Sequence, residues 1–225
     1  MEALTLQLFA SLFFYVCVYL SILYLNDFAS TNQVYHVVDD PPLYDRGHKL
    51  IPLINKIYPD IGVGCFIAYF VLRWGVKYPY ALMNYLLMVS FLFIGRVVIL
   101  SVTQLPPALP GCSTVKPGEK LHYLNALKES WHMCIDYMYS GHTLHSVIIV
   151  LFILYLSKSW VEKSIAIFAV IIEMVLIIGS RIHYTADVLV GALVSILIFF
   201  AWPGLGNIKT HINNGGIYGA ILSRK

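Results

Sequence analysis

Two short stretches of the chain carry the residues best suited to acid–base and nucleophilic chemistry. The first, MCIDYMYSGHTLHS at residues 133–146, places His142 directly after a Ser-Gly turn. The second, SRIHYTADVLVG at residues 180–191, contains His183 and Asp187, which are four residues apart. On a helix this spacing puts both side chains on one face. Each stretch stands before an apolar run, where a buried polar group is costly and usually functional.

The types of these residues favour phosphoryl transfer. Asp187 can accept an N–H of the His183 ring, which fixes the tautomer and leaves the other nitrogen free to attack. The helix expected after Ser140 offers free backbone N–H groups to an anion, and Arg181 adds fixed positive charge beside His183. In such a site a nucleophile attacks phosphorus and an acid protonates the departing oxygen. A lone histidine here is more often an interfacial residue, so the pairing carries the prediction.

The composition indicates a membrane protein. Of the 225 residues, 59% are hydrophobic and only 12% are charged, and the mean hydropathy is +0.74. A soluble domain of this size cannot bury that much apolar surface. The net charge is only +3, and no basic run with interleaved aromatic residues suggests nucleic acid. Neither an HExxH motif nor a Cys/His metal spacing occurs, so we expect no metal and no cofactor.

Six apolar segments are candidate membrane spans, of which the second and the fourth are short for a full crossing. Lipid requires them to be helical because it offers no partner to backbone groups. We therefore expect an all-α polytopic membrane protein, a six-helix transmembrane bundle that forms one catalytic domain over residues 1–225. The predicted spans are residues 6–25, 61–76, 80–102, 143–156, 164–179 and 186–202.

The loop charges predict the orientation of these spans. Arg73 lies in the last turn of span two, Lys77 lies between spans two and three, and Lys158 and Lys163 lie between spans four and five. Positively charged short loops face the cytosol, so both termini are expected to be cytosolic. Spans four and six then both run inward from the non-cytosolic face. Their starts, which carry the two histidines, should therefore lie on that same face.

At these residues the chain resembles the sphingomyelin synthase family, the lipid phosphotransferases related to type 2 phosphatidic acid phosphatases. The segment CIDYMYSGHT resembles the family motif C-G-D-Y-x-[FY]-S-G-H-T, with Ile135 in place of Gly. The segment HYTADVLVGA, residues 183–192, resembles H-Y-T-V-D-V-V, with Ala186 in place of Val.

Two further segments are similar to motifs of the same family. DDPPLYD at residues 39–45 is similar to P-P-L-P-D, with Tyr44 in place of the second-last Pro. FIGRVVILSVTQLPP at residues 93–107 is similar to R-x-x-x-x-x-x-T-x-L-P. The four motifs occur in family order and, with the six spans, cover most of the chain.

The resemblance implies a catalytic triad of His142, His183 and Asp187. His183 would attack the phosphodiester of a glycerophospholipid, releasing diacylglycerol, and His142 would protonate the leaving oxygen. The hydroxyl of ceramide would then attack the phosphohistidine, with His142 as the base. Residues expected to support catalysis or bind the headgroup are Asp136, which would orient His142, and Ser140, Arg96, Arg181 and Glu119.

The resemblance leaves several alternatives open. The headgroup could be phosphocholine, phosphoethanolamine or, in an inositol phosphorylceramide synthase, phosphoinositol. A lipid phosphate phosphatase would use water as the acceptor, but its upstream Arg-Pro pair does not occur in this sequence. A scramblase or scaffold would not need the histidines.

The expected partners are membrane lipids: a glycerophospholipid donor, ceramide and diacylglycerol. A homo-oligomer is left open. The family also implies a multi-pass protein of the Golgi apparatus, endoplasmic reticulum or plasma membrane, with a lumenal or exoplasmic site. Cys112 and Cys134 flank one loop and would be either a disulfide or two free thiols.

Overall fold

The structure is a computed structural model, and it describes residues 2–32, 41–103, 105–109, 138–206, 208 and 210. Within these residues the chain is helical, which confirms the expected all-α class. The helices are α1 (Glu2–Asn32), α3 (Arg46–Leu50), α4 (Ile57–Phe70) with its π-helical continuation η1 (Val71–Gly75), α5 (Pro79–Val102), α7 (Gly141–Leu156), α8 (Trp160–Gly179) and α9 (Thr185–Ala201).

A helix lies over each of the six apolar segments, but the helices begin earlier than the apolar runs. The second segment was expected from Ile61, whereas α4 begins at Ile57 and carries Asp60 in its first turn. The fourth begins at Gly141, because the Ser140 side chain accepts the N–H of Thr143 and caps the helix. Hydropathy marks the apolar part of a helix, whereas capping residues decide where the helix starts.

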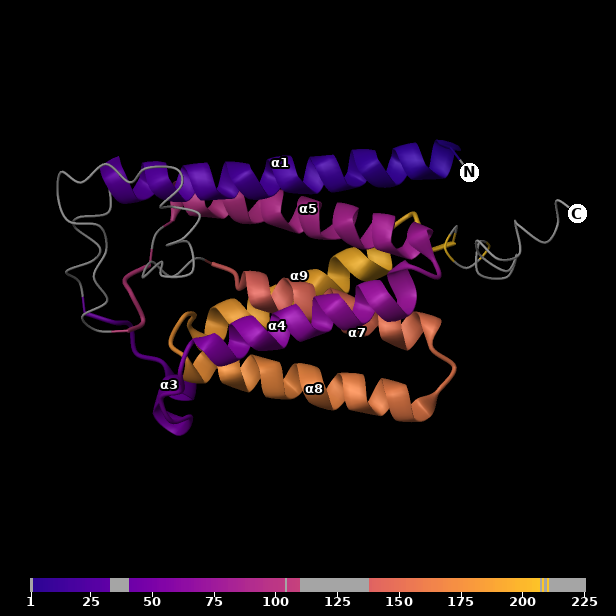
Figure 1. Cartoon of the computed structure of the whole chain (residues 1–225). Coiled ribbons are helices and arrows are strands. Elements are labelled where there is room, and N and C mark those ends of the chain that lie inside the picture. The colour runs from indigo at the N-terminus through magenta and orange to yellow at the C-terminus, as the bar shows by residue number, and fades with distance from the viewer. Residues whose placement is uncertain are drawn as a thin grey trace, which may run out of the picture.

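The long helices alternate in direction and form a bundle (Figure 1). Helix α1 lies against α5 along one edge, and α8 lies at the opposite edge. The starts of α4, α7 and α9 all lie at the end of the bundle that carries α3. Residues far apart in the sequence therefore meet at this end.

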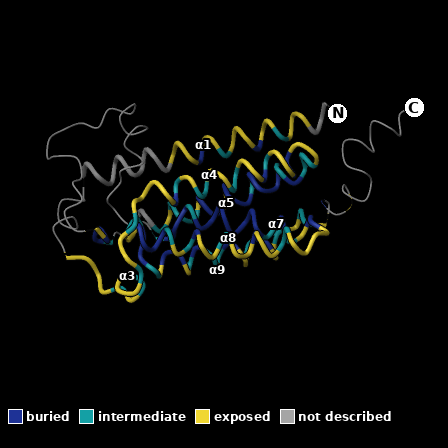
Figure 2. Tube along the Cα trace, turned by 60° about the horizontal axis from the view of Figure 1, so that its bottom comes forward, coloured by how far each residue is buried: buried dark blue, intermediate teal, exposed yellow. Residues whose placement is uncertain are grey.

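Helix α7 is the central element of the bundle. It contacts α4, α5, α8 and α9, and all but four of its 16 residues are buried. In Figure 2 the buried residues run through the centre of the bundle, whereas α1 and α3 are mostly exposed. A helix surrounded in this way has little freedom to shift, so it is a firm base for side chains at its first turn.

A polar contact joins α7 to its neighbours inside the apolar core. The hydroxyl of Tyr85 on α5 lies 2.6 Å from Nδ1 of His145, and the hydroxyl of Tyr15 on α1 lies 3.4 Å from Nε2. His145 is 8% exposed. It is therefore an interhelical packing residue with both ring nitrogens engaged, which agrees with the rule that buried polar groups are hydrogen-bonded.

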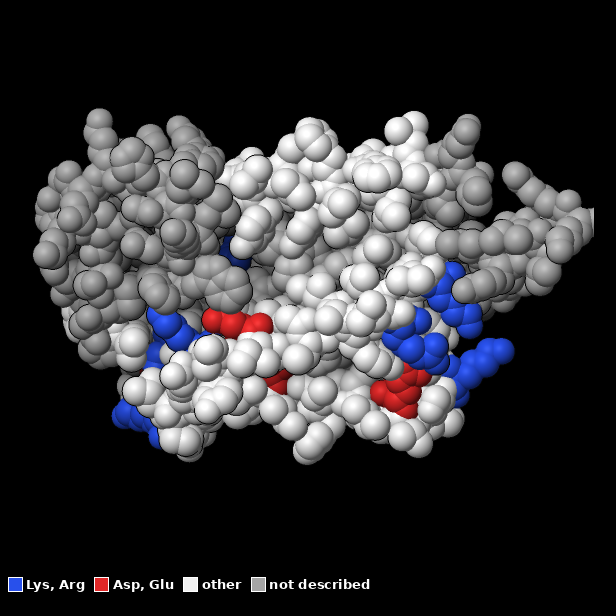
Figure 3. All heavy atoms as spheres, in the orientation of Figure 1, with Lys and Arg blue, Asp and Glu red and all other residues white. Residues whose placement is uncertain are grey.

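The apolar helices and the distribution of surface charge are typical of membrane proteins. Two helical segments, Ile57–Gly75 and Pro79–Ile99, are long and apolar enough to cross a membrane, and Thr5–Ser21, α7 and α9 are shorter apolar helices. On the face in Figure 3, Lys and Arg side chains gather toward the two ends and the middle is largely uncharged. Six crossings and cytosolic termini remain predictions.

Candidate active site

The starts of α7 and α9 are joined by a direct backbone hydrogen bond. The N–H of Ser140 donates to the carbonyl of Asp187 at 3.2 Å. The two helices can approach this closely because residue 191 is glycine. A Cβ at Gly191 would lie 3.3 Å from the Ser140 carbonyl oxygen. The two stretches that sequence analysis singled out are thus neighbours in space.

The two histidines face one another across this junction. The ring centroids of His142 and His183 are 6.4 Å apart, with an angle of 68° between the ring planes. His183 is 5% exposed, whereas 25% of the His142 side chain is exposed. A small tetrahedral group could contact both rings. Such a group would enter from the side of His142, the more exposed of the two histidines.

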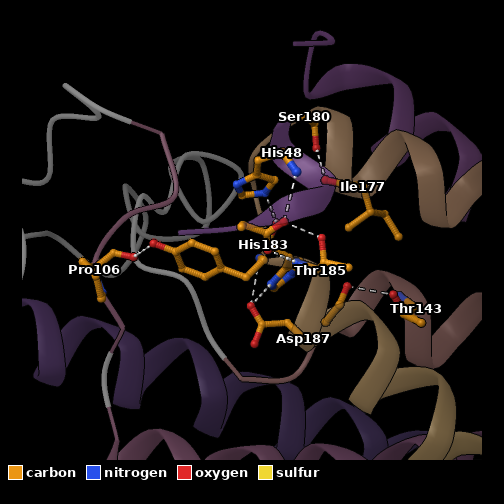
Figure 4. A network of polar contacts seen from close by, with 11 residues as sticks. His48, Pro106, Thr143, Ile177, Ser180, His183, Thr185 and Asp187 are labelled. Carbon is orange, nitrogen blue, oxygen red and sulfur yellow. Dashed lines mark hydrogen bonds and ion pairs between the residues drawn. The ribbon is translucent and has the colours of Figure 1, made fainter. Parts of the chain in front are cut away.

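Asp187 is the carboxylate partner of His183. Its Oδ2 lies 3.9 Å from Nδ1 of His183 and accepts the backbone N–H of Tyr184 at 3.0 Å, as Figure 4 shows. Asp187 is fully buried. The carboxylate is therefore held in place by the first turn of α9, on the Nδ1 side of the ring.

The pKa of His183 lies well below its ordinary value. Burial is the main cause, and the positive charge of Arg96 acts in the same direction, against the opposing effect of Asp187. The imidazole is consequently neutral at neutral pH, which is the state in which a ring nitrogen can act as a nucleophile.

Tyr184 connects three of the family-like segments around His183. Its hydroxyl donates to the carbonyl of Pro106 at 3.1 Å and accepts the N–H of Leu43 at 2.9 Å. The His48 ring stacks on Tyr184, with centroids 5.5 Å apart, and its Nε2 lies 3.0 Å from the carbonyl oxygen of His183. Figure 4 shows His48 and Pro106 on either side of the α8–α9 connection that carries His183.

Asp45 is hydrogen-bonded to the first residue of α9. Its carboxylate accepts the backbone N–H and the hydroxyl of Thr185 at 2.7 and 2.6 Å and the N–H of His48 at 3.0 Å. Burial alone would raise the pKa of Asp45, but these hydrogen bonds lower it below its ordinary value. The residues of the PPLYD segment therefore hold the His183 turn, although they lie about 140 residues earlier in the chain.

Arg181 and Arg96 occupy different places. The Arg181 guanidinium donates to the backbone carbonyls of Ile178 at 3.0 Å, Ile51 at 2.9 Å and His48, so it ties the segment before α4 to the end of α8. Arg96 on α5 lies against the first residue of α7, because a Cβ at Gly141 would be 2.5 Å from its Nη1. The positive group at the histidine pair is thus Arg96.

The structure adds Asp60, which sequence analysis missed. Its Oδ1 lies 2.8 Å from Nε2 of His142. Asp60 stands one residue before the apolar run that begins at Ile61, so hydropathy does not include it in the span. The available signal was an acidic residue at the start of a span on the same face as both histidines.

The remaining candidates divide into two groups. Asp136, Glu119, Cys112 and Cys134 lie outside the described residues. Two tyrosines next to the candidate residues, Tyr139 and Tyr184, are 4% and 3% exposed, and their hydroxyls donate to the carbonyls of Leu92 and Pro106. Among the described residues no group of three or more His, Cys, Asp or Glu side chains could hold a metal ion.

Fold and site define an all-helical protein with paired histidines at one end of the bundle. Residues 133–203, which include both histidines and Asp187, match the PAP2 superfamily C-terminal family. The chain is 26% identical over 193 residues to phosphatidylcholine:ceramide cholinephosphotransferase 1 of Caenorhabditis elegans, a match that covers 72% of this chain and 39% of that protein. It thus spans about two fifths of the length of this curated relative. These matches confirm the resemblance to the sphingomyelin synthase family.

Proposed function

We propose that this protein is a membrane-embedded lipid phosphotransferase that moves a phospho-headgroup from a glycerophospholipid to ceramide. The products are a phosphosphingolipid and diacylglycerol. The observation that carries the proposal is the pair of imidazoles on two helix starts, with ring centroids 6.4 Å apart. The similarity to a ceramide cholinephosphotransferase supports ceramide as the acceptor and phosphocholine as the headgroup. Phosphoethanolamine is the alternative headgroup of the same proposal.

In the first step a ring nitrogen of His183 attacks the phosphorus of the donor lipid. A nitrogen–phosphorus bond forms, and the bond from phosphorus to the diacylglycerol oxygen breaks with its electron pair going to that oxygen. His142 gives the oxygen a proton, and Asp187 stabilises the positive charge on the His183 ring. Diacylglycerol leaves, and the phospho-headgroup remains on His183.

In the second step the primary hydroxyl of ceramide attacks the same phosphorus. His142, now neutral, takes the hydroxyl proton while the nitrogen–phosphorus bond breaks and returns its electron pair to His183. Both lipids present their reacting groups at the same depth of the leaflet, which supplies much of the orientation that a two-substrate reaction needs.

Arg96 and the first turn of α7 stabilise the phosphate oxygens. Arg96 Nη1 lies against Gly141, where the helix leaves its first backbone N–H groups without intrahelical acceptors. Fixed positive charge and aligned N–H groups are most effective in a site that excludes water, where the charge of the transition state is poorly screened.

The membrane arrangement belongs to the same proposal. Six crossings with cytosolic termini would place the histidine end on the lumenal or exoplasmic face, in the Golgi apparatus, the endoplasmic reticulum or the plasma membrane. The alternating helix directions in Figure 1 and the clustering of Lys and Arg at the ends in Figure 3 support this arrangement. Accessibility of cysteines introduced at Lys77 and Lys49 to an impermeant thiol reagent would test it.

The proposed activity is tested by reconstituting the protein in vesicles with labelled ceramide and a panel of phospholipid donors. The variants are His183→Ala and His142→Ala, with Gly64→Ala as a folded control, since a Cβ at Gly64 meets nothing within 4 Å. Headgroup-labelled donor should leave acid-labile, base-stable label on the native protein and none on His183→Ala. Full turnover by His183→Ala would refute the covalent scheme. Headgroup release that needs no ceramide would favour the phosphatase.

A further inference from the structure

His142 has a carboxylate partner of its own. Asp60 Oδ1 lies 2.8 Å from His142 Nε2, and 21% of the Asp60 side chain is exposed. Within the described residues, the hydrogen bond of the His142 ring is the one between Nε2 and the Asp60 carboxylate. Asp60 lies outside the four family-like segments and outside the matched residues 133–203.

The position of Asp60 is set by the packing of α4. This helix lies against both α7 and α8. At Gly62 it comes so close to α8 that a Cβ would overlap the carboxyl group of Glu173, a residue that is 2% exposed. Because α4 packs against both α7 and α8, its position is fixed, and its first turn places Asp60 next to the His142 ring.

The site therefore contains two aspartate–histidine pairs. Asp187 lies on the Nδ1 side of His183 at 3.9 Å, whereas Asp60 lies at Nε2 of His142, at 2.8 Å. A carboxylate at hydrogen-bond distance, as Asp60 is, accepts the N–H of the nitrogen it faces, and it thereby decides which nitrogen of the ring is left for the chemistry.

We propose that Asp60 is a positioning residue of the general acid–base His142. It accepts the Nε2–H, so that Nδ1 is the nitrogen that exchanges protons with the substrates. This inference rests on the proposed function, since it assigns a partner to the histidine that handles the leaving group and the acceptor.

The proton balance is simple. In the first step the doubly protonated His142 ring gives its Nδ1 proton to the departing diacylglycerol oxygen and becomes neutral, with Nε2–H still bound to Asp60. In the second step Nδ1 takes the proton of the ceramide hydroxyl, which restores the cation. Asp60 accepts the Nε2–H throughout, and it stabilises the cationic ring before the first transfer and after the second.

The test compares two donors that differ in their need for an acid. Diacylglycerol is a poor leaving group that requires a proton, whereas the nitrophenolate of p-nitrophenyl phosphocholine leaves without one. The variants are Asp60→Asn and Asp60→Glu. The control is Glu162→Gln, which removes a hydrogen-bonded carboxylate between α8 and Tyr69 of α4 and whose side chain is 17% exposed.

Asp60→Asn should lower ceramide-dependent transfer from phosphatidylcholine on the order of 100-fold, the scale of one general acid–base contribution. It should lower first-turnover release of nitrophenolate by less than about threefold. Asp60→Glu should recover part of the loss, and Glu162→Gln should change the rates with both donors by the same factor. A merely structural role of Asp60 would not separate the two donors.

Two results would overturn the inference: unchanged transfer by Asp60→Asn, or equal loss with both donors. If Asp60→Asn does not fold, Asp60→Glu decides the matter, because a misplaced carboxylate should still slow the phospholipid donor more than the activated one. A failure of the inference about Asp60 is distinguishable from a failure of the proposed function. A fully active Asp60→Asn beside an inactive His183→Ala rejects only the role of Asp60, whereas an active His183→Ala rejects the covalent mechanism.

Discussion

Arg96 can lie against the start of α7 because residue 141 has no side chain. The substitution Gly141→Ala therefore displaces the Arg96 guanidinium without removing it. The new Cβ would lie 2.5 Å from Arg96 Nη1 and 3.4 Å from Phe93 Cε1, whereas ordinary contacts begin at 3.4 Å. One of the two groups must withdraw by about 1 Å. Most residues of α7 are buried, and its N-cap Ser140 is hydrogen-bonded to α9, so the guanidinium is the part that moves.

A displacement of this size should lower kcat by about 10- to 100-fold, because misplacing a charge by about 1 Å in a preorganised site has effects of that order. Stability should not fall in parallel. Alanine restricts the unfolded chain more than glycine does, which stabilises the folded protein by roughly 0.4–1 kcal/mol and offsets part of the crowding. The two properties are therefore expected to separate.

The assay is transfer to fluorescent ceramide in reconstituted vesicles, combined with the melting temperature of each variant in detergent. Gly64→Ala is the matched control, since its Cβ meets no atom within 4 Å. Arg96→Ala should be as slow as Gly141→Ala, and the double variant should be little slower than either, because both changes break one interaction. Activity of Gly141→Ala within about twofold of the native protein would refute this reasoning, as would a fully active Arg96→Ala.

Three further predictions concern stability and can be checked by thermal unfolding in detergent. Gly62→Ala should lower the melting temperature because its Cβ overlaps the Glu173 carboxyl, and the loss should shrink in the double variant with Glu173→Ala; Gly64→Ala should show no such loss. Asp45→Asn should cost roughly 1–2 kcal/mol at neutral pH by weakening charge-assisted hydrogen bonds, and the difference from the native protein should vanish as the pH falls below about 4, where the unfolded carboxylate is protonated. The folded-state pKa of His183 is depressed, so the contribution of His183 to the free energy of unfolding is complete above about pH 6.5. Below that pH the free energy of unfolding should fall by up to about 1.4 kcal/mol per pH unit. His183→Gln should flatten this part of the plot of stability against pH, and an unchanged slope would contradict the prediction.

Hydropathy and motif spacing were sufficient for the helices and for the pieces of the site. Apolar runs located a helix over each predicted segment, since burial and lipid exposure both select apolar residues along the whole helix. The loop charges placed the starts of spans four and six on one face, and the histidine rings do lie side by side at one end of the bundle. These inferences depend on local sequence and chain direction, which the residue order carries directly.

The role of DDPPLYD is different, because the motif by itself did not indicate what Asp45 contacts. The carboxylate binds Thr185, which lies 140 residues later in the chain. Arg181 likewise binds backbone carbonyls, not the space between the histidines. Which of several charged residues faces a site depends on the course of the connections, and hydropathy does not encode that course.

The sequence by itself determined that this chain is helical and apolar, and that it carries two histidines, a carboxylate and an arginine suited to phosphoryl transfer. Only the tertiary structure decided that Asp60 meets His142 and that Arg96 lies at the start of α7. Those contacts join residues 82 apart in one case and two different helices in the other. They follow from how closely α4, α5 and α7 pack, which depends on many small side-chain volumes acting together and not on any local pattern.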